Sequence, residues 1–247
     1  MHSADGSAAK KTLKRKKIEL KFKIATYNIH RCIGTDGILD PERVGKVIQE
    51  IDADVIALQE LASEPGTQND VLQYLANLTG TYPTQGFTLI DKNEGYGNAL
   101  LSKIPFSKID RINISVPNRE PRGIIKAELN HNGKNLEFFA THLGLSAAER
   151  QFQVDHILSL LNQSRADIKI LMGDFNEWFI WGKRLRHLKH YFTPISSPRT
   201  FPAKFPIFKL DRIWISPAKH LISINRYITS LSRIASDHLP LIVEFSI

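Results

Sequence analysis

The chain is 247 residues long, 42% hydrophobic and 23% charged, which indicates a globular protein with enough apolar residues for one large core. No segment approaches the ~18–20 consecutive apolar residues of a membrane-spanning helix, and the basic N-terminal segment lacks the apolar stretch of a secretory signal. The single cysteine, Cys32, excludes an intrachain disulfide and fits a reducing compartment, so we expect a cytoplasmic location.

The net charge of +8 is concentrated near the N-terminus. Residues 1–23 hold eight Lys or Arg and two acids, which leaves 25 basic and 23 acidic residues in the rest of the chain. We therefore expect residues 1–19 to be a basic, disordered tail and residues 20–247 to form one domain, and we expect a monomer. The tail can attract nucleic acid or an anionic membrane surface, but a solvated extension is the simpler interpretation.

The first half of the chain is predicted to form strands interrupted by two helices. Residues 20–26 alternate in polarity, which indicates a half-buried strand that ends at Asn28. Asp40 followed by Pro41 is typical of a helix start, and a second buried strand runs from 54 to Glu60. A helix over 69–78 precedes strands at about 84–91, 97–102, 108–115, 122–130 and 134–141.

The second half continues with one long helix and three strands. Ser146 with Glu149 three residues later predicts a capping box that opens a helix to about residue 161. The apolar run 168–172 indicates a buried strand, which stops at Gly173 and is followed by Asp174 and Asn176. A basic, aromatic and proline-rich region covers about 178–209, and further strands are expected over 210–215 and 239–245.

Polar side chains lie at the ends of these strands. Four of them follow their apolar runs and three precede theirs, and only antiparallel neighbours bring both kinds of end to one rim. Strands in runs with helices inserted singly indicate an α+β fold. We therefore expect one polar rim formed by Asn28, Glu60, His142, Asp174, Asn176, Asp211, Asp237 and His238.

Oxygen ligands at such a rim suit a hard divalent cation, Mg²⁺ or Mn²⁺, which would relieve the repulsion between crowded carboxylates. A hard metal beside histidine and amide donors can hydrolyse a phosphate ester, because the metal polarises the phosphoryl oxygen while a carboxylate aligns water. Each residue alone is more often structural, but six matched strand ends are poorly explained by chance.

At this point the chain resembles the endonuclease/exonuclease/phosphatase family, the DNase I-like phosphoesterases, and in particular its small bacterial members. The resemblance covers about residues 20–247, and the matching pieces appear in the family's order. They are Tyr27-Asn28-Ile29-His30, Leu58-Gln59-Glu60, Gly97-Asn98-Ala99-Leu100-Leu101-Ser102, Thr141-His142-Leu143, Gly173-Asp174-Phe175-Asn176, Leu210-Asp211-Arg212-Ile213 and Ser236-Asp237-His238, with a Thr-Phe-Pro loop before the Leu-Asp-Arg-Ile strand.

The resemblance implies a four-layer αββα sandwich with two mixed, mainly antiparallel sheets, and a divalent-metal phosphoesterase. It also implies roles for the rim residues. Glu60, Asn28 and Asp237 would hold the metal; Asp174 would orient or deprotonate water; Asn176 would hold a phosphate oxygen. His238, oriented by Asp211, would contact the scissile phosphate, His142 would stabilise or protonate the departing side, and Arg119 or Arg122 would bind phosphate.

The sequence leaves the substrate open. We expect nuclease-like hydrolysis of a phosphodiester, with a phospholipid or a soluble phosphoester as the alternative substrate. A non-catalytic binding module is less favoured because Glu60, Asp174, Asp237 and His238 are all present. The segment from Lys183 to Lys209 interleaves cations and aromatic rings without an acid, a pattern that suits a nucleic-acid groove or an anionic membrane surface. We expect this segment to select the substrate, with nucleic acid slightly favoured over a membrane; a loop that merely closes the core is the structural alternative.

Overall fold

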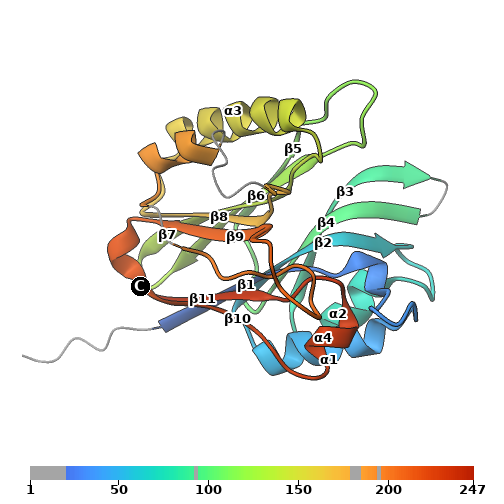
Figure 1. Ribbon diagram of the computed structural model, residues 1–247. Coiled ribbons are helices and arrows are strands. Elements are labelled where there is room, and N and C mark those ends of the chain that lie inside the picture. Colours follow the sequence, from blue (N-terminus) through green and yellow to red (C-terminus); the bar gives the residue numbers. More distant parts are fainter. Residues whose placement is uncertain (1–20, 92–93, 179–184, 194–195) are drawn as a thin grey trace, which may run out of the picture.

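The computed structural model describes residues 21–91, 94–178, 185–193 and 196–247, and the predicted basic tail over residues 1–19 lies outside them. Two β-sheets dominate the described chain, and they stack face to face (Figure 1). The six-stranded sheet has the order β10-β11-β1-β2-β4-β3. Its strands are β1 (Lys21–Asn28), β2 (Val55–Ser63), β3 (Tyr82–Asp91), β4 (Glu94–Ser102), β10 (Leu221–Arg226) and β11 (Leu241–Ser246).

The five-stranded sheet has the order β5-β6-β7-β8-β9. Its strands are β5 (Lys108–Asn113), β6 (Gly123–His131), β7 (Lys134–His142), β8 (Ile168–Asp174) and β9 (Asp211–Ser216). The helix α3 (Ala147–Gln163) covers the outer face of this sheet, whereas α1 (Pro41–Ile51), α2 (Val71–Thr79) and the short α4 (Ser232–Ala235) cover the other sheet (Figure 1). The predicted four-layer αββα sandwich is confirmed.

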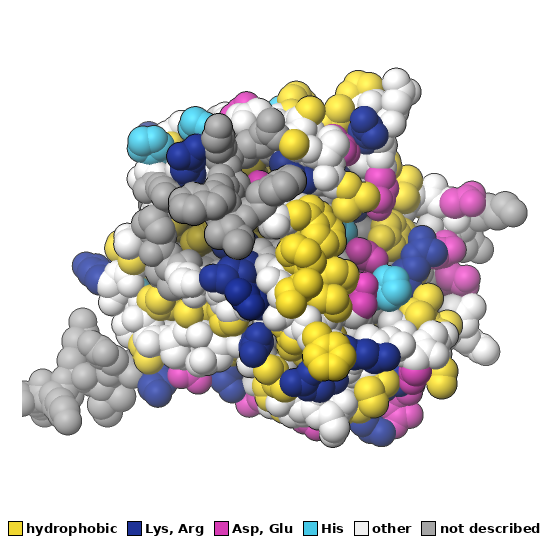
Figure 2. All heavy atoms as spheres, in the orientation of Figure 1, with side chains coloured by type: hydrophobic (Ala, Val, Ile, Leu, Met, Phe, Trp, Pro, Cys, Tyr) yellow, Lys and Arg dark blue, Asp and Glu magenta, His cyan; other side chains and the backbone are white. Residues whose placement is uncertain are grey.

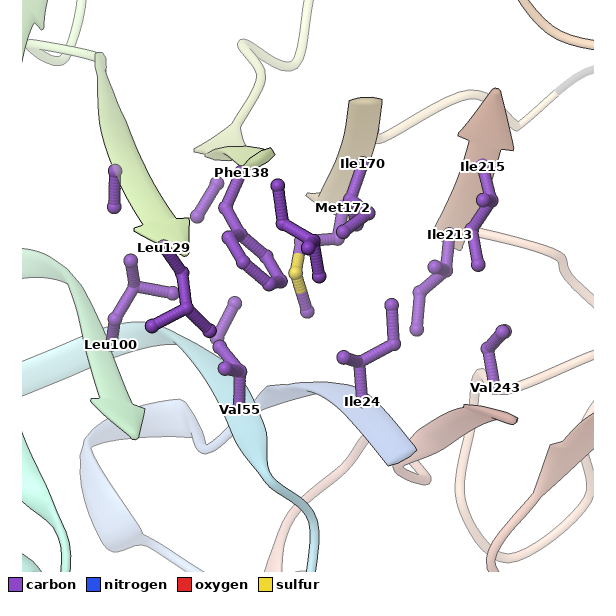
Figure 3. Packing of buried hydrophobic residues seen from close by; sticks show 14 of the residues in the cluster. Ile24, Val55, Leu100, Leu129, Phe138, Ile170, Met172, Ile213, Ile215 and Val243 are labelled. Carbon is purple, nitrogen blue, oxygen red and sulfur yellow. The ribbon is translucent and has the colours of Figure 1, made fainter. Parts of the chain in front are cut away.

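Three apolar layers hold these elements together. The central layer lies between the sheets, where Ile24, Val55, Phe138 and Met172 meet (Figure 3). A second layer joins the large sheet to α1 and α2, and a third joins the small sheet to α3. Since strands with both faces buried read as continuous apolar runs, this layering explains the unbroken runs in β2 and β8.

The helix boundaries follow the predicted capping residues. Asp40 accepts a hydrogen bond from the Arg43 amide at the start of α1, and Ser146 forms the full capping box with Glu149 at the start of α3. One strand and one α-helix were not predicted: β10 is a half-exposed edge strand with a weak polarity pattern, and α4 is a single turn. The short 3-10 helices His30–Cys32, Leu185–His190 and Ala218–His220 were not predicted either. No helix among the described residues is long and apolar enough to cross a membrane.

Strand directions place the polar ends on one rim. β1 pairs antiparallel with β11 and β8 pairs antiparallel with β9, as the rim argument requires. In each sheet one further pair is parallel, β1 with β2 and β7 with β8, so two carboxyl ends also meet side by side. The parallel pair β7–β8 sets His142 directly beside Asp174 in register.

Gly173 makes this register possible. Its φ is +145°, and a Cβ built there would lie 1.8 Å from the Thr141 carbonyl oxygen on the neighbouring strand. Only a residue without a side chain fits so close to that strand. Gly173 therefore lets β8 continue to its last residue, Asp174, without being pushed away from β7.

We predict that Gly173→Ala destabilises the protein more than Gly133→Ala, the matched control. Gly133 also has positive φ, +73°, but a Cβ there would have no atom within 4 Å. Both substitutions incur the backbone penalty of about 1–2 kcal/mol, and Gly173→Ala adds overpacking of about 1–3 kcal/mol. Urea unfolding of the two variants measures the difference, and equal losses of free energy would contradict this account.

Candidate active site

Asp174 lies at the centre of the polar rim and is only 1% exposed. Its Oδ1 accepts a hydrogen bond from the Asn176 amide at 2.9 Å, and its Oδ2 accepts one from the Asn28 side chain at 3.1 Å. The Nε2 atoms of His142 and His238 lie 3.6 and 3.7 Å from the same Oδ2. A buried carboxylate is costly unless it is paired, and these contacts supply partners for both oxygens and fix the direction of the Asp174 side chain.

Asn28 joins the two sheets at the site. Its Nδ2 also donates to Glu60 Oε1 at 3.0 Å, while its Oδ1 accepts from the His30 backbone at 3.1 Å. Glu60 has φ of +56°, and the pairing of β2 with β4 shifts register between Leu58 and Leu61. This irregularity turns Glu60 out of the strand alternation, and a left-handed non-glycine residue at such a position stores strain of a kind found at functional sites.

His238 is held by Asp211, as the sequence predicts. The His238 Nδ1 lies 2.9 Å from Asp211 Oδ2, and Thr200 donates its hydroxyl to the same oxygen. Burial would lower the pKa of His238, but the carboxylates of Asp211, Asp174 and Asp237 outweigh it and raise the pKa to about 10. At neutral pH His238 is therefore an imidazolium whose Nε2 faces Asp174.

His142 has the opposite protonation state. Asn176 uses its amide N–H groups to donate to Leu143 O and to His142 Nε2, both at 2.9 Å. The Nη1 of Arg122 lies 3.4 Å from Nδ1 and can also only donate, so both ring nitrogens of His142 face hydrogen-bond donors. Burial, helped by the charges of Arg122 and His238, lowers the pKa of His142 to about 3 against the opposing effect of Asp174. Both roles expected for His142, stabilising and protonating the departing side, stay predictions.

The same hydrogen bonds constrain the role predicted for Asn176. Its amide hydrogens are already directed to Leu143 and His142, so holding a phosphate oxygen requires Asn176 to give up one of these contacts. The residue is 4% exposed and has φ of +48°, which directs its side chain back under the rim.

Arg122, but not Arg119, reaches the rim in the described chain. Arg122 is buried, forms a two-point ion pair with Glu120 at 2.9 and 3.0 Å, and has its Nη1 3.4 Å from His142 Nδ1. Arg119 lies in an exposed turn, where its backbone N–H donates to Val116 O at 3.2 Å. Of the two predicted phosphate-binding arginines, Arg122 is therefore the one that the fold brings to the site.

Two groups of side chains have the chemistry to hold a cation. Asp174, Asp211 and His238 offer ligand atoms within 4.8 Å of one another, and Asp211 Oδ1 is buried without a hydrogen-bond partner among the described residues. The predicted ligands are arranged differently: Asn28 contacts Glu60, whereas Asp237 is half-buried with its Oδ1 4.0 Å from His30 Nδ1. Both groups are rich in oxygen, which fits a hard divalent ion.

Several rim residues were not assigned a role from the sequence. Phe201 lies against His238 with ring centroids 4.7 Å apart, and Ser236 donates from its hydroxyl to Asn28 O at 2.7 Å. Arg31 lies over the Tyr96 ring at 4.6 Å, and burial followed by the nearby carboxylate of Glu60 raises the pKa of Tyr96. Thr200, Phe201 and Ser236 fall inside quoted motifs, so their positions could have been found; no signal pointed to Tyr96 or Arg31.

We predict that Asp211→Asn lowers the pKa of His238 from about 10 toward the ordinary value of about 6.5, because the closest carboxylate is lost. NMR titration of the imidazole signals in EDTA measures the pKa of His238. Asp110→Asn on β5 is the control and should leave that pKa unchanged. Since the folded pKa is the higher one, charged His238 stabilises the fold fully below pH ~6.5, and this stabilisation is lost as the pH rises toward 10. An unchanged pKa in Asp211→Asn would contradict the pairing.

Known proteins are similar to this chain in sequence or in fold. YbhP of Escherichia coli K12, described as uncharacterized, is 26% identical over 249 residues, which cover 92% of this chain and 96% of YbhP. The crystal structure of an endonuclease/exonuclease/phosphatase from Bacteroides vulgatus superposes with a TM-score of 0.76 at 15% identity, covering 92% of this chain and 98% of that one. A mannosyl-6-phosphatase of Bacteroides thetaiotaomicron superposes with a TM-score of 0.70 at 18% identity, covering 90% and 98%.

The match to the family itself extends through the whole site. Residues 25–238 match the Endonuclease/Exonuclease/phosphatase family, a range that begins in β1 and ends at His238. The strand ends that carry Asn28, Glu60, His142, Asp174 and Asp211 all lie inside it. The chain belongs to the Endonuclease/Exonuclease/phosphatase family.

Proposed function

We propose that this protein is a divalent-metal-dependent phosphodiesterase that hydrolyses its substrate by attack of water. The observation that carries the proposal is the buried carboxylate of Asp174, held between Asn28, His142 and the His238–Asp211 pair. Membership of a family of phosphoesterases supports the reaction class, whereas the metal and the substrate remain part of the proposal.

In the proposed mechanism each residue acts at a defined atom. His238 presents a charged Nε2 that binds a non-bridging phosphate oxygen, and Asp211 keeps the ring in that orientation. Asp174, whose Oδ2 lies 3.7 Å from the Nε2 of His238, then accepts the proton of the attacking water or orients it. Neutral His142, with Arg122 behind it, stabilises charge on the leaving side.

A metal ion fits the residues of the rim. Glu60 and Asn28, with Asp237, would hold it as the resemblance implies; the alternative group of Asp174, Asp211 and His238 would first require His238 to lose its proton, because an imidazolium cannot ligate a metal. When bound, Mg²⁺ or Mn²⁺ would supply charge stabilisation at the phosphoryl oxygen.

The geometry of the site supports the reaction type more directly than it supports a substrate class. The sequence favours nuclease-like cleavage, but the same fold is found in a mannosyl-6-phosphatase, so fold alone does not choose the leaving group. Screening the purified protein with Mg²⁺ against DNA, RNA, bis-p-nitrophenyl phosphate and phospholipids distinguishes the classes. A cytoplasmic location and a monomeric state remain part of the proposal, and the buried, unpaired Cys32 is consistent with a reducing compartment.

We predict that hydrolysis is abolished by EDTA and restored by Mg²⁺ or Mn²⁺. Glu60→Gln should weaken metal binding, because it removes one charge from the oxygen-rich group, and calorimetric titration with Mg²⁺ measures the affinity directly. Full activity in EDTA would rule out the metal mechanism.

We also predict that Asp174→Asn lowers kcat about 10²–10⁴-fold, because it removes the base while keeping the shape of the side chain. The matched control is Asp110→Asn, a surface acid on β5 paired with Lys108, which should keep wild-type kcat. Steady-state kinetics on bis-p-nitrophenyl phosphate, with far-UV circular dichroism to show that the variant is folded, provide the measurement. Wild-type kcat in Asp174→Asn would refute the assignment.

A further inference from the structure

An exposed hydrophobic surface lies beside the site, and we call it the apolar rim. It consists of side chains from the segment after β8, the segment before β9, and the loops near α1 and α4. Figure 2 shows such a surface next to acidic and histidine side chains, with Lys and Arg around it. Its members, with exposed fractions, are Ile38 58%, Leu39 65%, Trp178 36%, Phe205 80%, Ile207 57% and Ile234 41%.

The rim is connected directly to the site. The segment 201–208 folds back on itself through a bridge between Phe201 and Phe208. Phe201 at its base contacts His238, and the Ala203 amide donates to Asp237 O at 2.6 Å. Phe205 and Ile207 are therefore carried on a short turn whose base touches two residues of the site.

This turn is held rigidly, although its tip is exposed. Arg233 donates to Lys204 O at 2.6 Å and to Ala203 O at 3.4 Å, and Trp178 packs edge-on against both Phe201 and Phe208. Large hydrophobic side chains on a fixed, exposed turn indicate a surface that is preorganised for contact with an apolar phase.

The segment that carries Trp178, Phe205 and Ile207 has charge of one sign in sequence, whereas the loop that carries Ile38 and Leu39 also holds Asp36 and Asp40. No acid occurs in sequence between Glu177 and Asp211, and this stretch carries seven Lys or Arg. Among the described ones, Lys204 and Arg199 are exposed, and Lys204 directly precedes Phe205. A cation beside an exposed ring fits an anionic bilayer, where the ring enters the acyl boundary and the cation remains among the headgroups.

The composition of the rim favours a bilayer over nucleic acid. Single-stranded nucleic acid binds to ring faces on which bases stack. Four of the six rim side chains are aliphatic and offer no ring face, and Trp178 has its ring engaged with two phenylalanines. Aliphatic side chains gain free energy by leaving water for lipid, which is the contact this surface provides.

We propose that the apolar rim docks on an anionic lipid bilayer and presents the site to the phosphodiester of a phospholipid headgroup. The choice of substrate rests on the proposed phosphodiesterase function, whereas the docking itself does not. This departs from the slight preference for nucleic acid drawn from the sequence, because the exposure of the aliphatic residues is visible only in the fold.

The test uses the full chain and sedimentation with vesicles made of equal parts phosphatidylcholine and phosphatidylglycerol. The double variant Phe205→Ser with Ile207→Ser should lower the vesicle–water partition coefficient about ten-fold or more, because two apolar side chains that would enter the bilayer are lost. The control is Ile222→Ser, an isoleucine 44% exposed at the start of β10, at the opposite end of the sheet from Asn28. It should bind vesicles like the wild type.

Two further measurements separate the possible outcomes. Hydrolysis of soluble bis-p-nitrophenyl phosphate should be unchanged in both variants, which shows that the site is intact. If the wild type does not hydrolyse bis-p-nitrophenyl phosphate, but binds vesicles and the double variant does not, the proposed function is wrong and the docking surface is supported. Absence of vesicle binding by the wild type, equal binding by the double variant, or selective loss of oligonucleotide binding instead would overturn the proposal.

Discussion

The site depends on burying one carboxylate with partners for both of its oxygens. Asp174 is almost fully buried, yet two imidazoles, an amide and a backbone N–H surround it. A buried carboxylate without partners would be costly, and these neighbours supply them. Much of the rest of the rim can be understood as the support that this one side chain requires.

The two histidines show how the same side chain acquires different properties a few ångströms apart. His238 has a carboxylate on its Nδ1 side and becomes positively charged, whereas His142 has an arginine on its Nδ1 side and stays neutral. Their environments therefore make one histidine cationic and leave the other neutral, so that two identical side chains can take different roles in one site.

The sequence predicted the strands and the polar rim because both depend on patterns that are local, whereas the four-layer arrangement was implied by the family resemblance. Apolar runs ending in Asn28, Glu60 and Asp174 identify strands and their ends without knowledge of the partners. The parallel pairs, the choice between Arg119 and Arg122, and the contact of Arg31 with Tyr96 depend on residues far apart in the chain. The roles of the individual site residues remain predictions, since geometry shows where a group lies and kinetics shows what it does.

The bond between Asn28 and Asp174 joins residues 146 positions apart and links the two sheets. Such a contact can form only after both sheets exist and have docked, and contacts of long sequence separation are slow to form. The site is therefore complete only when the two sheets have docked: a half-folded intermediate, even one with native strands, does not yet contain an assembled site.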